Sequence, residues 1–478
     1  MGCIMEKFIK KLVGFSLGPI IAAFIAFITI PITTYFIDPS EYGKASMFSL
    51  FQTILGTFLY LGIDQSYTRE YHSSNNKLNL FQNAILIPIF LSFIGLFIIL
   101  LFPTQTSLVL FDSNEYILPS ILFGIMVVAM VIERFILLSL RMQEKALEYS
   151  MLNILAKFAI LIFTIIFVLF VRRDFLAVVF STVLGQILAD LYLLIRYRKL
   201  FDFKGFSIDK SLMKKMLIFG FPIVIATSLS SVLNSFDRIA LRTWSDFFQI
   251  GIFTATLKIA GVLTVVQLSF TSFWVPTAYR WYEEGKDIRY FRIVSDSILF
   301  CMSILFVGVL IFKDLIVFVL SSGYSESAYI IAFLCLQPII YTVSETTCLG
   351  IVFSRKSYLS IWVGLIAIIP NLIINFLLVP KYGALGAAIA TAVSYVFFFI
   401  ARTYFSNKNG MKFATIKHNF VFLLLLAISF INIIDSSWII YLNIGFLLIV
   451  AAFQITTVKE FWGLYKKRGT NKEETMQI

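Results

Sequence analysis

Apolar residues recur along the chain in runs of about twenty, and short polar segments separate these runs. A helix of that length crosses the hydrocarbon core of a bilayer, because each residue adds about 1.5 Å along the axis. The alternating ten-residue segments of a transmembrane β-barrel are absent from the sequence. The pattern predicts an all-α, polytopic membrane protein with about fourteen spans, at residues 12–37, 43–63, 83–102, 117–140, 150–171, 175–195, 216–241, 249–275, 295–312, 327–350, 358–379, 383–404, 418–434 and 437–457.

Composition and charge support this assignment. Hydrophobic residues make up 59% of the chain and charged residues only 14%, and the mean hydropathy is +0.90. Most of the 39 Lys and Arg residues fall in the termini and in the loops on one predicted side, although Arg172 and Arg173 are a local exception. The positive-inside rule then places both termini in the cytoplasm. The net charge of +12 thus indicates topology and contact with anionic lipids rather than nucleic-acid binding.

The second half of the chain repeats the first, weakly but in order. The paired segments are KKLVGFSLGPIIA with KKMLIFGFPIVIA, DPSEYG with DFFQIG, YTREYH with YRWYEE, and LFVRRD with LLVPKY, at offsets of about 203 to 211 positions. Six spans separate the copies, so both copies have the same orientation, as in many secondary transporters. We expect two pseudo-symmetric six-helix lobes, residues 1–205 and 206–408, followed by two appended helices and a cytoplasmic tail in residues 409–478.

Several segments, taken in order, resemble a known family. FIDPSEYG, LGIDQSYTREY, SFDRIAL, FWVPTAYRWY and NLIINFLLVPKYGALGAAIATAVSY are similar to segments of the polysaccharide exporters, which include O-antigen flippases. That family belongs to the superfamily of multidrug, oligosaccharidyl-lipid and polysaccharide exporters. The resemblance covers about residues 8 to 405.

The resemblance implies a function and a set of partners. It implies a bacterial inner-membrane protein that flips oligosaccharides linked to undecaprenyl pyrophosphate, such as O-antigen or capsule precursors, to the periplasmic leaflet. Alternating access would operate through a V-shaped cavity between the lobes, coupled to H⁺ or Na⁺. The implied partners are the polyprenyl-pyrophosphate-linked glycan, membrane lipids, a polysaccharide polymerase and a chain-length regulator.

Charges inside the apolar runs are the main candidates for a site, since a charge at the bilayer centre costs about 2.5–3.5 kcal/mol. In the seventh run, a polar stripe with helical spacing contains Asn234 and Arg238, and Lys258 lies at similar depth in the next run. Arg238 and Lys258 could line a cavity and bind a pyrophosphate. The alternative is an ion pair between Asp237 and Lys258, with Arg238 reaching the lipid headgroups. Asp237 is also a candidate for ion coupling.

Other charges inside the runs suit pairing or ion coupling. Glu133 and Lys157 lie twelve residues on either side of a predicted turn, so both sit at one depth in neighbouring helices. We expect a structural ion pair between them, and a proton relay at Glu133 is the alternative. Asp64 and Glu345 are the other acids that we consider for ion coupling.

The remaining candidates lie at helix ends or beside a proline. Arg69 and Arg280, at equivalent ends of the second and eighth runs, could receive the substrate headgroup or anchor lipid phosphates. Asn371 and Asn375 lie one turn apart after Pro370. Their amides could bind sugars or satisfy backbone groups that the proline leaves without a partner.

Enzymatic chemistry has little support in the sequence. The two histidines, His72 and His418, lack metal-ligand or catalytic-triad spacing, and the polar segments leave no room for a soluble catalytic domain. We expect no enzymatic activity, no cofactor, no metal and no nucleic-acid partner. Two other functions stay open. A multidrug antiporter of the same superfamily should show a cavity dominated by acids, and a membrane polymerase should carry a large periplasmic loop rich in Arg and His.

Overall fold

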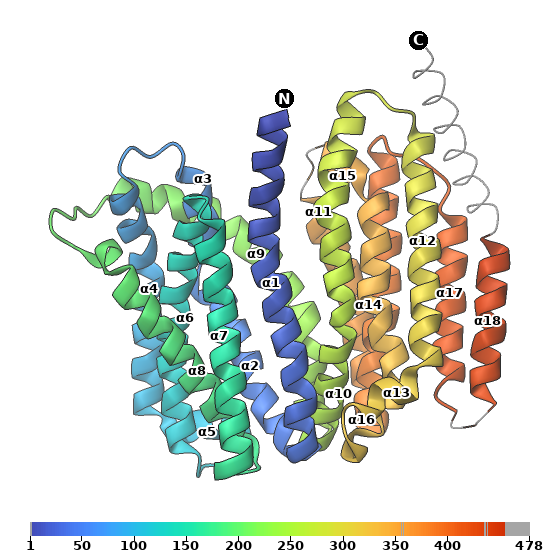
Figure 1. Ribbon diagram of the computed structural model, residues 1–478, viewed down its shortest axis with the longest axis horizontal. Coiled ribbons are helices and arrows are strands. Elements are labelled where there is room, and N and C mark those ends of the chain that lie inside the picture. Colours follow the sequence, from blue (N-terminus) through green and yellow to red (C-terminus); the bar gives the residue numbers. More distant parts are fainter. Residues whose placement is uncertain (1, 355, 357, 435, 437, 455–478) are drawn as a thin grey trace. The chain divides into compact units, whose positions relative to one another are not determined.

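A computed structural model describes residues 2–354, 356, 358–434, 436 and 438–454, and every regular element within them is helical. The predicted all-α fold class is therefore confirmed. The predicted C-terminal tail and the last three residues of the last predicted span, 455–457, lie outside the described residues. The α-helices (Figure 1) are α1 (Gly2–Phe36), α2 (Pro39–Leu59), α3 (Ile63–Glu70), α4 (Lys77–Leu101), α5 (Pro103–Phe111), α6 (Ile117–Met142), α7 (Ala146–Ile166), α8 (Phe175–Arg196), α9 (Lys210–Trp244), α10 (Phe247–Ala260), α11 (Val262–Glu283), α12 (Ile288–Ile311), α13 (Lys313–Phe318), α14 (Ser327–Thr347), α15 (Leu349–Phe353), α16 (Leu359–Lys408), α17 (Ile416–Ile431) and α18 (Ile439–Phe453).

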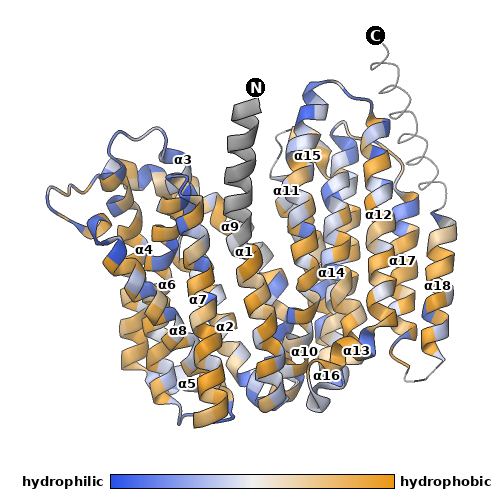
Figure 2. Ribbon diagram, viewed as in Figure 1, coloured by the Kyte–Doolittle hydropathy of each residue, from blue (hydrophilic) through white to orange (hydrophobic). Residues whose placement is uncertain are grey.

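Eight helices in the described ranges are long and apolar enough to cross a membrane, and α2 with α3, bent by 54°, adds a ninth when counted as one span. Shorter apolar helices lie at Ile20–Phe36, Ile416–Ile431 and Ile439–Ala452. Apolar residues dominate the helices in Figure 2. The prediction of a multi-pass membrane protein is thus confirmed, and the count of fourteen is approximate. Apart from residue 358, the two predicted spans 358–379 and 383–404 fall within α16, whose backbone is non-helical at Gly383.

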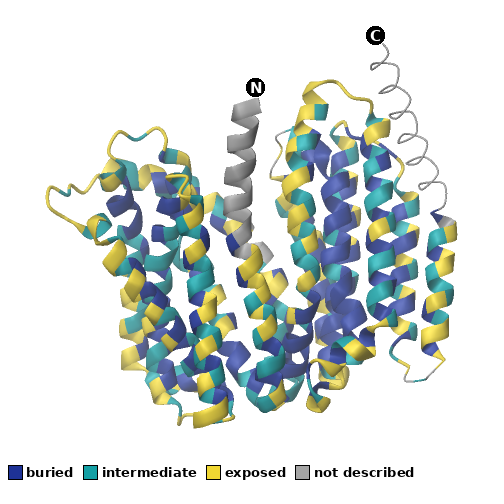
Figure 3. Cartoon of the chain, viewed as in Figure 1, coloured by how far each residue is buried: buried dark blue, intermediate teal, exposed yellow. Residues whose placement is uncertain are grey.

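The chain forms two compact units, and the first comprises Met1–Arg242 and Asp246–Thr254. Within it, α7 contacts both α1 and α8, and α6 contacts α4, α5 and α8. One apolar core cluster, which includes Tyr67, Phe135 and Met216, joins α3, α4, α6 and the start of α9. A second cluster, which includes Phe111 and Phe175, joins α2, α5, α6 and α8. Figure 3 shows buried positions along the facing sides of these helices.

The starts of α2 and α10 cross inside the first unit through a reciprocal glycine contact. A Cβ atom on Gly43 would lie 1.9 Å from the carbonyl oxygen of Phe247, and one on Gly251 would lie 1.9 Å from the carbonyl oxygen of Pro39. Both Gly43 with Gly251 and Pro39 with Phe247 are separated by the 208 positions of the repeat. The two sides of this local contact exchange under that offset, and the predicted pseudo-symmetric lobes stay a prediction.

The second unit comprises Thr243–Ser245 and Ala255–Ile478. Its central helix is α14, which is mostly buried and contacts α11, α12, α16 and α17. The indole Nε1 of Trp274 on α11 donates to the carbonyl oxygen of Glu345 at 3.2 Å. On α12, Ser295 Oγ accepts from Thr346 at 2.7 Å and lies 2.9 Å from His418 Nε2. Polar side chains thus connect α14 to its neighbours inside an otherwise apolar core.

Helix α9 up to Arg242 belongs to the first unit, whereas the repeat places it at the start of the second lobe. Ser66 on α3 donates to the carbonyl oxygen of Met216 at 2.7 Å. A Cβ atom on Gly62 would lie 2.3 Å from the carbonyl oxygen of Gly220, so the two backbones touch. These contacts hold the first turns of α9 against α3, and the lobe boundaries at 205 and 408 stay a prediction.

Candidate functional site

The polar stripe on α9 lies in the first unit and reaches α2. Asp237 is buried, at 3% exposure. Arg238 is half-buried, and its Nε has no hydrogen-bond partner among the described residues. One turn earlier, Asn234 is exposed, and the hydroxyl oxygen of Ser231 lies 3.1 Å from that of Thr57. The stripe therefore combines a buried acid with a cation that retains hydrogen-bonding capacity.

Lys258, the second cation predicted for this site, is exposed on α10 and belongs to the second unit. Arg238 and Asp237 belong to the first unit. Both interpretations of these residues therefore stay predictions. One is a cationic lining that combines Lys258 with Arg238, and the other is an ion pair of Lys258 with Asp237.

Asp64, one of the acids considered for ion coupling, forms an ion pair between α3 and α6. Its Oδ2 lies 2.7 Å from Arg134 Nη2, and the Asp64 side chain is only 8% exposed. The Arg134 guanidinium also lies 5.7 Å from the ring centroid of Tyr60. Sequence reasoning selected Asp64 but not Arg134. The position of Arg134 inside the fourth apolar run is the sequence feature that indicates a buried partner for an acid.

A second polar cluster of the first unit involves α6, α7 and α8. Glu133 on α6 lies close to the side chain of Gln186. Gln186 Nε2 donates to Asp190 Oδ1 at 3.1 Å. Lys157 is exposed on α7 and close enough to Glu133 for an electrostatic interaction. The pairing of Glu133 with Lys157 stays a prediction. Sequence reasoning missed the buried Asp190, although its carboxyl group lies inside the sixth apolar run.

Glu345, the other acid considered for ion coupling, pairs with an arginine inside the second unit. Glu345 Oε1 lies 2.8 Å from Arg402 Nη1, and the two side chains are 8% and 18% exposed. The same nitrogen donates to Ser344 Oγ at 2.6 Å. The rings of Tyr341 and Phe398 lie 5.2 Å and 5.4 Å from the guanidinium. This arrangement compensates the charge of Arg402 within the apolar core.

The two asparagines after Pro370 lie on α16 and are fully buried. Asn375 Nδ2 donates to the carbonyl oxygen of Asn371 at 3.0 Å and to its side-chain oxygen at 3.2 Å. Asn371 is 1% exposed and Asn375 is 0% exposed. Hydrogen bonding within the same helix occupies the amide nitrogen of Asn375, and binding of sugars by the two residues stays a prediction.

The two arginines predicted at equivalent helix ends differ in their surroundings. Arg69 on α3 lies 4.3 Å from the ring centroid of Phe219 on α9. Arg280 on α11 is 64% exposed and lies 4.0 Å from Glu284 Oε1. The equivalence that the repeat implies for these arginines stays a prediction.

No group of three or more His, Cys, Asp or Glu side chains in the described ranges could hold a metal ion. The two histidines instead have structural neighbours. His418 is fully buried against Ser295 on α12, and the ring of His72 lies 5.5 Å from that of Tyr71.

These observations define a class of protein, a multi-pass helical membrane protein with charged and polar side chains buried in its helical units. Such side chains carry a free-energy cost in a membrane and mark pathways, relays or structural pairs. A family model described as polysaccharide biosynthesis protein matches residues 8–281, which is more than half of the chain. The chain belongs to this family, and the resemblance in its sequence motifs is confirmed.

Two curated relatives match part of the chain. One is the probable low-salt glycan biosynthesis flippase Agl15 of Haloferax volcanii, 26% identical over 166 residues, which are 32% of this chain and 35% of that protein. The other is the capsular polysaccharide biosynthesis protein CapF of Staphylococcus aureus, 22% identical over 196 residues, which are 40% of this chain and 50% of that protein. The chain therefore spans between a third and a half of the length of these relatives.

Solved structures of transporters have a similar fold. The lipid II flippase MurJ in an inward closed conformation matches with a TM-score of 0.68 at 14% identity, over 94% of this chain and 98% of that chain. An inward-facing multidrug resistance MATE family transporter of the MOP superfamily matches with a TM-score of 0.61 at 16% identity, over 84% of this chain and 100% of that chain. At these identities the likeness concerns the fold alone.

Proposed function

We propose that this protein is a flippase that moves an oligosaccharide linked to undecaprenyl pyrophosphate from the cytoplasmic to the periplasmic leaflet of a bacterial inner membrane. Membership of the polysaccharide biosynthesis family carries the proposal. The glycan flippase Agl15 and the capsular polysaccharide protein CapF among its relatives support it. The cargo would be an O-antigen or capsule precursor.

Cations suit such a cargo, because moving a pyrophosphate through an apolar region requires that its negative charges be compensated. Arg238 would bind the pyrophosphate through two parallel hydrogen bonds, and Lys258 would act as a mobile point charge. The amides of Asn234, Asn371 and Asn375 would hydrogen-bond the sugars. No covalent bond of the cargo changes in this process, so the proposal needs neither a cofactor nor a catalytic metal.

The proposed cycle is alternating access coupled to H⁺ or Na⁺, with Asp64, Asp237 and Glu345 as the coupling acids. Both termini would lie in the cytoplasm. A polysaccharide polymerase and a chain-length regulator would receive the glycan on the periplasmic side. The membrane lipids would contact the apolar side chains that remain exposed on the helices.

Substitutions at the two proposed pyrophosphate ligands test this function in cells that lack their own flippase. Arg238→Ala and Lys258→Ala should each abolish surface polysaccharide while the protein stays at normal levels in the membrane. Lys258→Arg should retain partial function, and Arg238→Lys should be worse than that exchange because it loses the planar fork. Surface glycan is measured beside membrane protein levels.

Lys286→Ala serves as a matched control, because Lys286 is a half-exposed lysine that lies 3.7 Å from Glu284. It should leave surface glycan unchanged.

If Lys258 instead pairs with Asp237, then Asp237→Ala and Lys258→Ala should both lower protein levels. Wild-type surface glycan from Arg238→Ala would contradict the proposed site. Restored drug resistance without restored glycan would favour a multidrug antiporter.

A further inference from the structure

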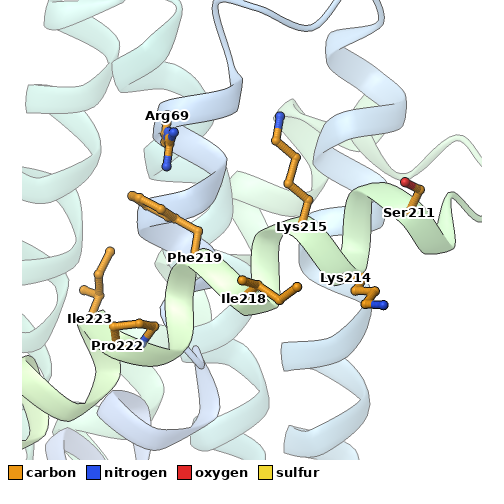
Figure 4. A pocket seen from close by; sticks show the side chains of 8 residues that line it. All are labelled: Arg69, Ser211, Lys214, Lys215, Ile218, Phe219, Pro222 and Ile223. Atoms are coloured by element: carbon orange, nitrogen blue, oxygen red, sulfur yellow. The ribbon is translucent and has the colours of Figure 1, made fainter.

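A groove on the first unit runs along the start of α9, beside the end of α3. Its volume is about 690 Å³, within the range of roughly 300–1,000 Å³ that ligand pockets occupy. All of its lining residues belong to the first unit. Figure 4 shows them: Arg69, Ser211, Lys214, Lys215, Ile218, Phe219, Pro222 and Ile223.

The groove carries an excess of positive charge. Arg69 lies over the ring of Phe219, and neither Arg69 nor Lys214 forms an ion pair within the residues that the structure describes. Lys215 Nζ lies 2.5 Å from Glu70 Oε2. Three cations against the single carboxylate of Glu70 leave a surplus of two positive charges. This surplus is available to an anionic ligand.

The ring of Phe219 restricts the guanidinium of Arg69 before any ligand arrives. A cation over an aromatic face is stabilised by the ring and loses part of its freedom. The edge of a guanidinium offers several N–H donors to a phosphate at fixed geometry. Arg69 and Lys215 lie on the same side of α9 in Figure 4, and Lys214 extends to the other side. A phosphate on Arg69 would therefore have the ammonium group of Lys215 on its own side of α9, and the charge of Lys214 would act from the other side of the helix.

Along α9, the lining changes from cationic to apolar in the direction that leads into the apolar part of the helix. Side chains four apart share a helix face. One row begins at Lys214 and continues with Ile218 and Pro222, and the neighbouring row begins at Lys215 and continues with Phe219 and Ile223. Ile218 is 65% exposed. The order of charge followed by hydrocarbon matches the order of headgroup and chain in a lipid.

We propose that this groove binds a membrane lipid through its phosphate headgroup, with the headgroup on Arg69 beside Lys215, the charge of Lys214 adding to the attraction, and the first part of the chain on Ile218 and Phe219. Glycerophospholipids of the bilayer and a polyprenyl pyrophosphate share this chemistry. The proposal does not depend on the proposed transport function, since a lipid could occupy the groove whether or not the protein carries glycan.

Fluorescence quenching tests the proposal with the full-length protein in lipid nanodiscs. Phe219→Trp places a reporter in the groove and keeps an aromatic face under Arg69, and the parent protein supplies the background of its six tryptophans. We expect phosphatidylglycerol with brominated chains to quench the reporter more strongly than phosphatidylcholine with the same chains. Arg69→Gln with Lys214→Gln, which leaves Lys215 with Glu70, should raise the phosphatidylglycerol fraction for half-quenching about tenfold or more.

Lys199→Gln with Lys204→Gln is the matched control, because both lysines are exposed, belong to the same unit and do not line the groove. It should keep the preference for phosphatidylglycerol.

Added unlabelled polyprenyl pyrophosphate distinguishes the two possible ligands, the carrier lipid and the bilayer phospholipid. Relief of quenching identifies the carrier lipid as a ligand, and unchanged quenching assigns the groove to bilayer phospholipid. Equal quenching by the two brominated lipids would overturn the proposal, and this comparison needs no charge variant. The assay involves no transport, so its failure would leave the proposed function standing.

Discussion

Two buried carboxylates in this protein lie against arginines of neighbouring helices. Asp64 with Arg134 joins α3 to α6, and Glu345 with Arg402 joins α14 to α16. Burying a charge costs free energy, and the opposite charge offsets much of that cost only while both partners stay in place. Loss of one partner is therefore more damaging than loss of both. These pairs hold helices together within each unit, and any ion coupling at the same acids would have to operate through them.

Arg402→Ala should destabilise the protein strongly. Glu345 would remain buried without its guanidinium partner, which costs about 3–5 kcal/mol. Replacing both residues, as Glu345→Gln with Arg402→Gln, should cost less than Arg402→Ala because no charge is left alone. The measurement is the temperature at which half of the detergent-solubilised protein loses its folded elution peak.

Arg280→Ala is the control for this experiment, because Arg280 is 64% exposed and lies 4.0 Å from Glu284. A surface substitution of this kind should change the free energy of unfolding by no more than about 0.5 kcal/mol. Equal losses from Arg402→Ala and Arg280→Ala would show that the buried pair contributes no special stability.

At the residue scale, sequence reasoning selected the acids but not their partners. Asp64 and Glu345 stand out as charges in or beside apolar runs. Arg134 lies 70 positions from Asp64, and the spacing within one helix does not tell which distant helix it faces. Hydropathy gives the depth of a side chain in a span, whereas its direction around the helix axis depends on packing. Asp190 differs from these residues, because its position inside the sixth apolar run already marks it as a candidate buried acid.

At the scale of elements, the crossing of α2 and α10 has the clearest sequence cause. Glycines at both crossing points remove the side chains that would keep the backbones apart. Ser46 and Thr254, also 208 positions apart, place their hydroxyl oxygens 3.3 Å from each other beside the crossing. The repeat in the sequence thus corresponds to a close contact between equivalent segments.

Gly43→Ala and Gly251→Ala should each weaken this crossing, and to a similar extent. Either Cβ atom would lie 1.9 Å from a carbonyl oxygen of the other helix, so the helices must separate. Such overpacking costs about 1–3 kcal/mol or more. The half-unfolding temperature of each purified variant, together with its yield in the membrane, measures the effect.

Gly95→Ala provides the comparison within the same unit. A Cβ atom on Gly95, inside α4, would meet nothing within 4 Å, and alanine favours the helix by up to about 1 kcal/mol. This variant should be as stable as the parent or slightly more stable. A Gly43→Ala protein as stable as Gly95→Ala would mean that the two helices do not need their close approach.

The positions of the helices could be predicted from apolar runs alone, because in a bilayer almost every spanning segment must satisfy its backbone internally. Boundaries between helices were harder to predict. In place of the turn expected near residue 380, the structure has one residue with a non-helical backbone, Gly383, inside α16. The repeat predicts that the second lobe starts at α9, whereas the first turns of α9 contact α3. Sequence similarity between copies does not determine which neighbour a helix contacts.

At the scale of the whole molecule, the chain consists of two compact helical units that hold charged and polar side chains inside apolar surroundings. Family membership links it to polysaccharide biosynthesis, and its fold is similar to the folds of the solved flippase and multidrug transporter structures. The central claim is therefore that the protein transfers a lipid-linked glycan between leaflets.

Reconstitution into liposomes tests that claim most directly. A polyprenyl-pyrophosphate oligosaccharide with a fluorophore on its sugar is placed in the inner leaflet, and a membrane-impermeant reductant outside destroys the fluorescence of molecules that reach the outer leaflet. We predict that the protein causes loss of the protected fluorescence, that Arg238→Ala greatly slows this loss, and that phosphatidylethanolamine with the same fluorophore on its headgroup stays protected. Full protection of the glycan lipid in the presence of folded protein, or equal movement of both lipids, would contradict the account.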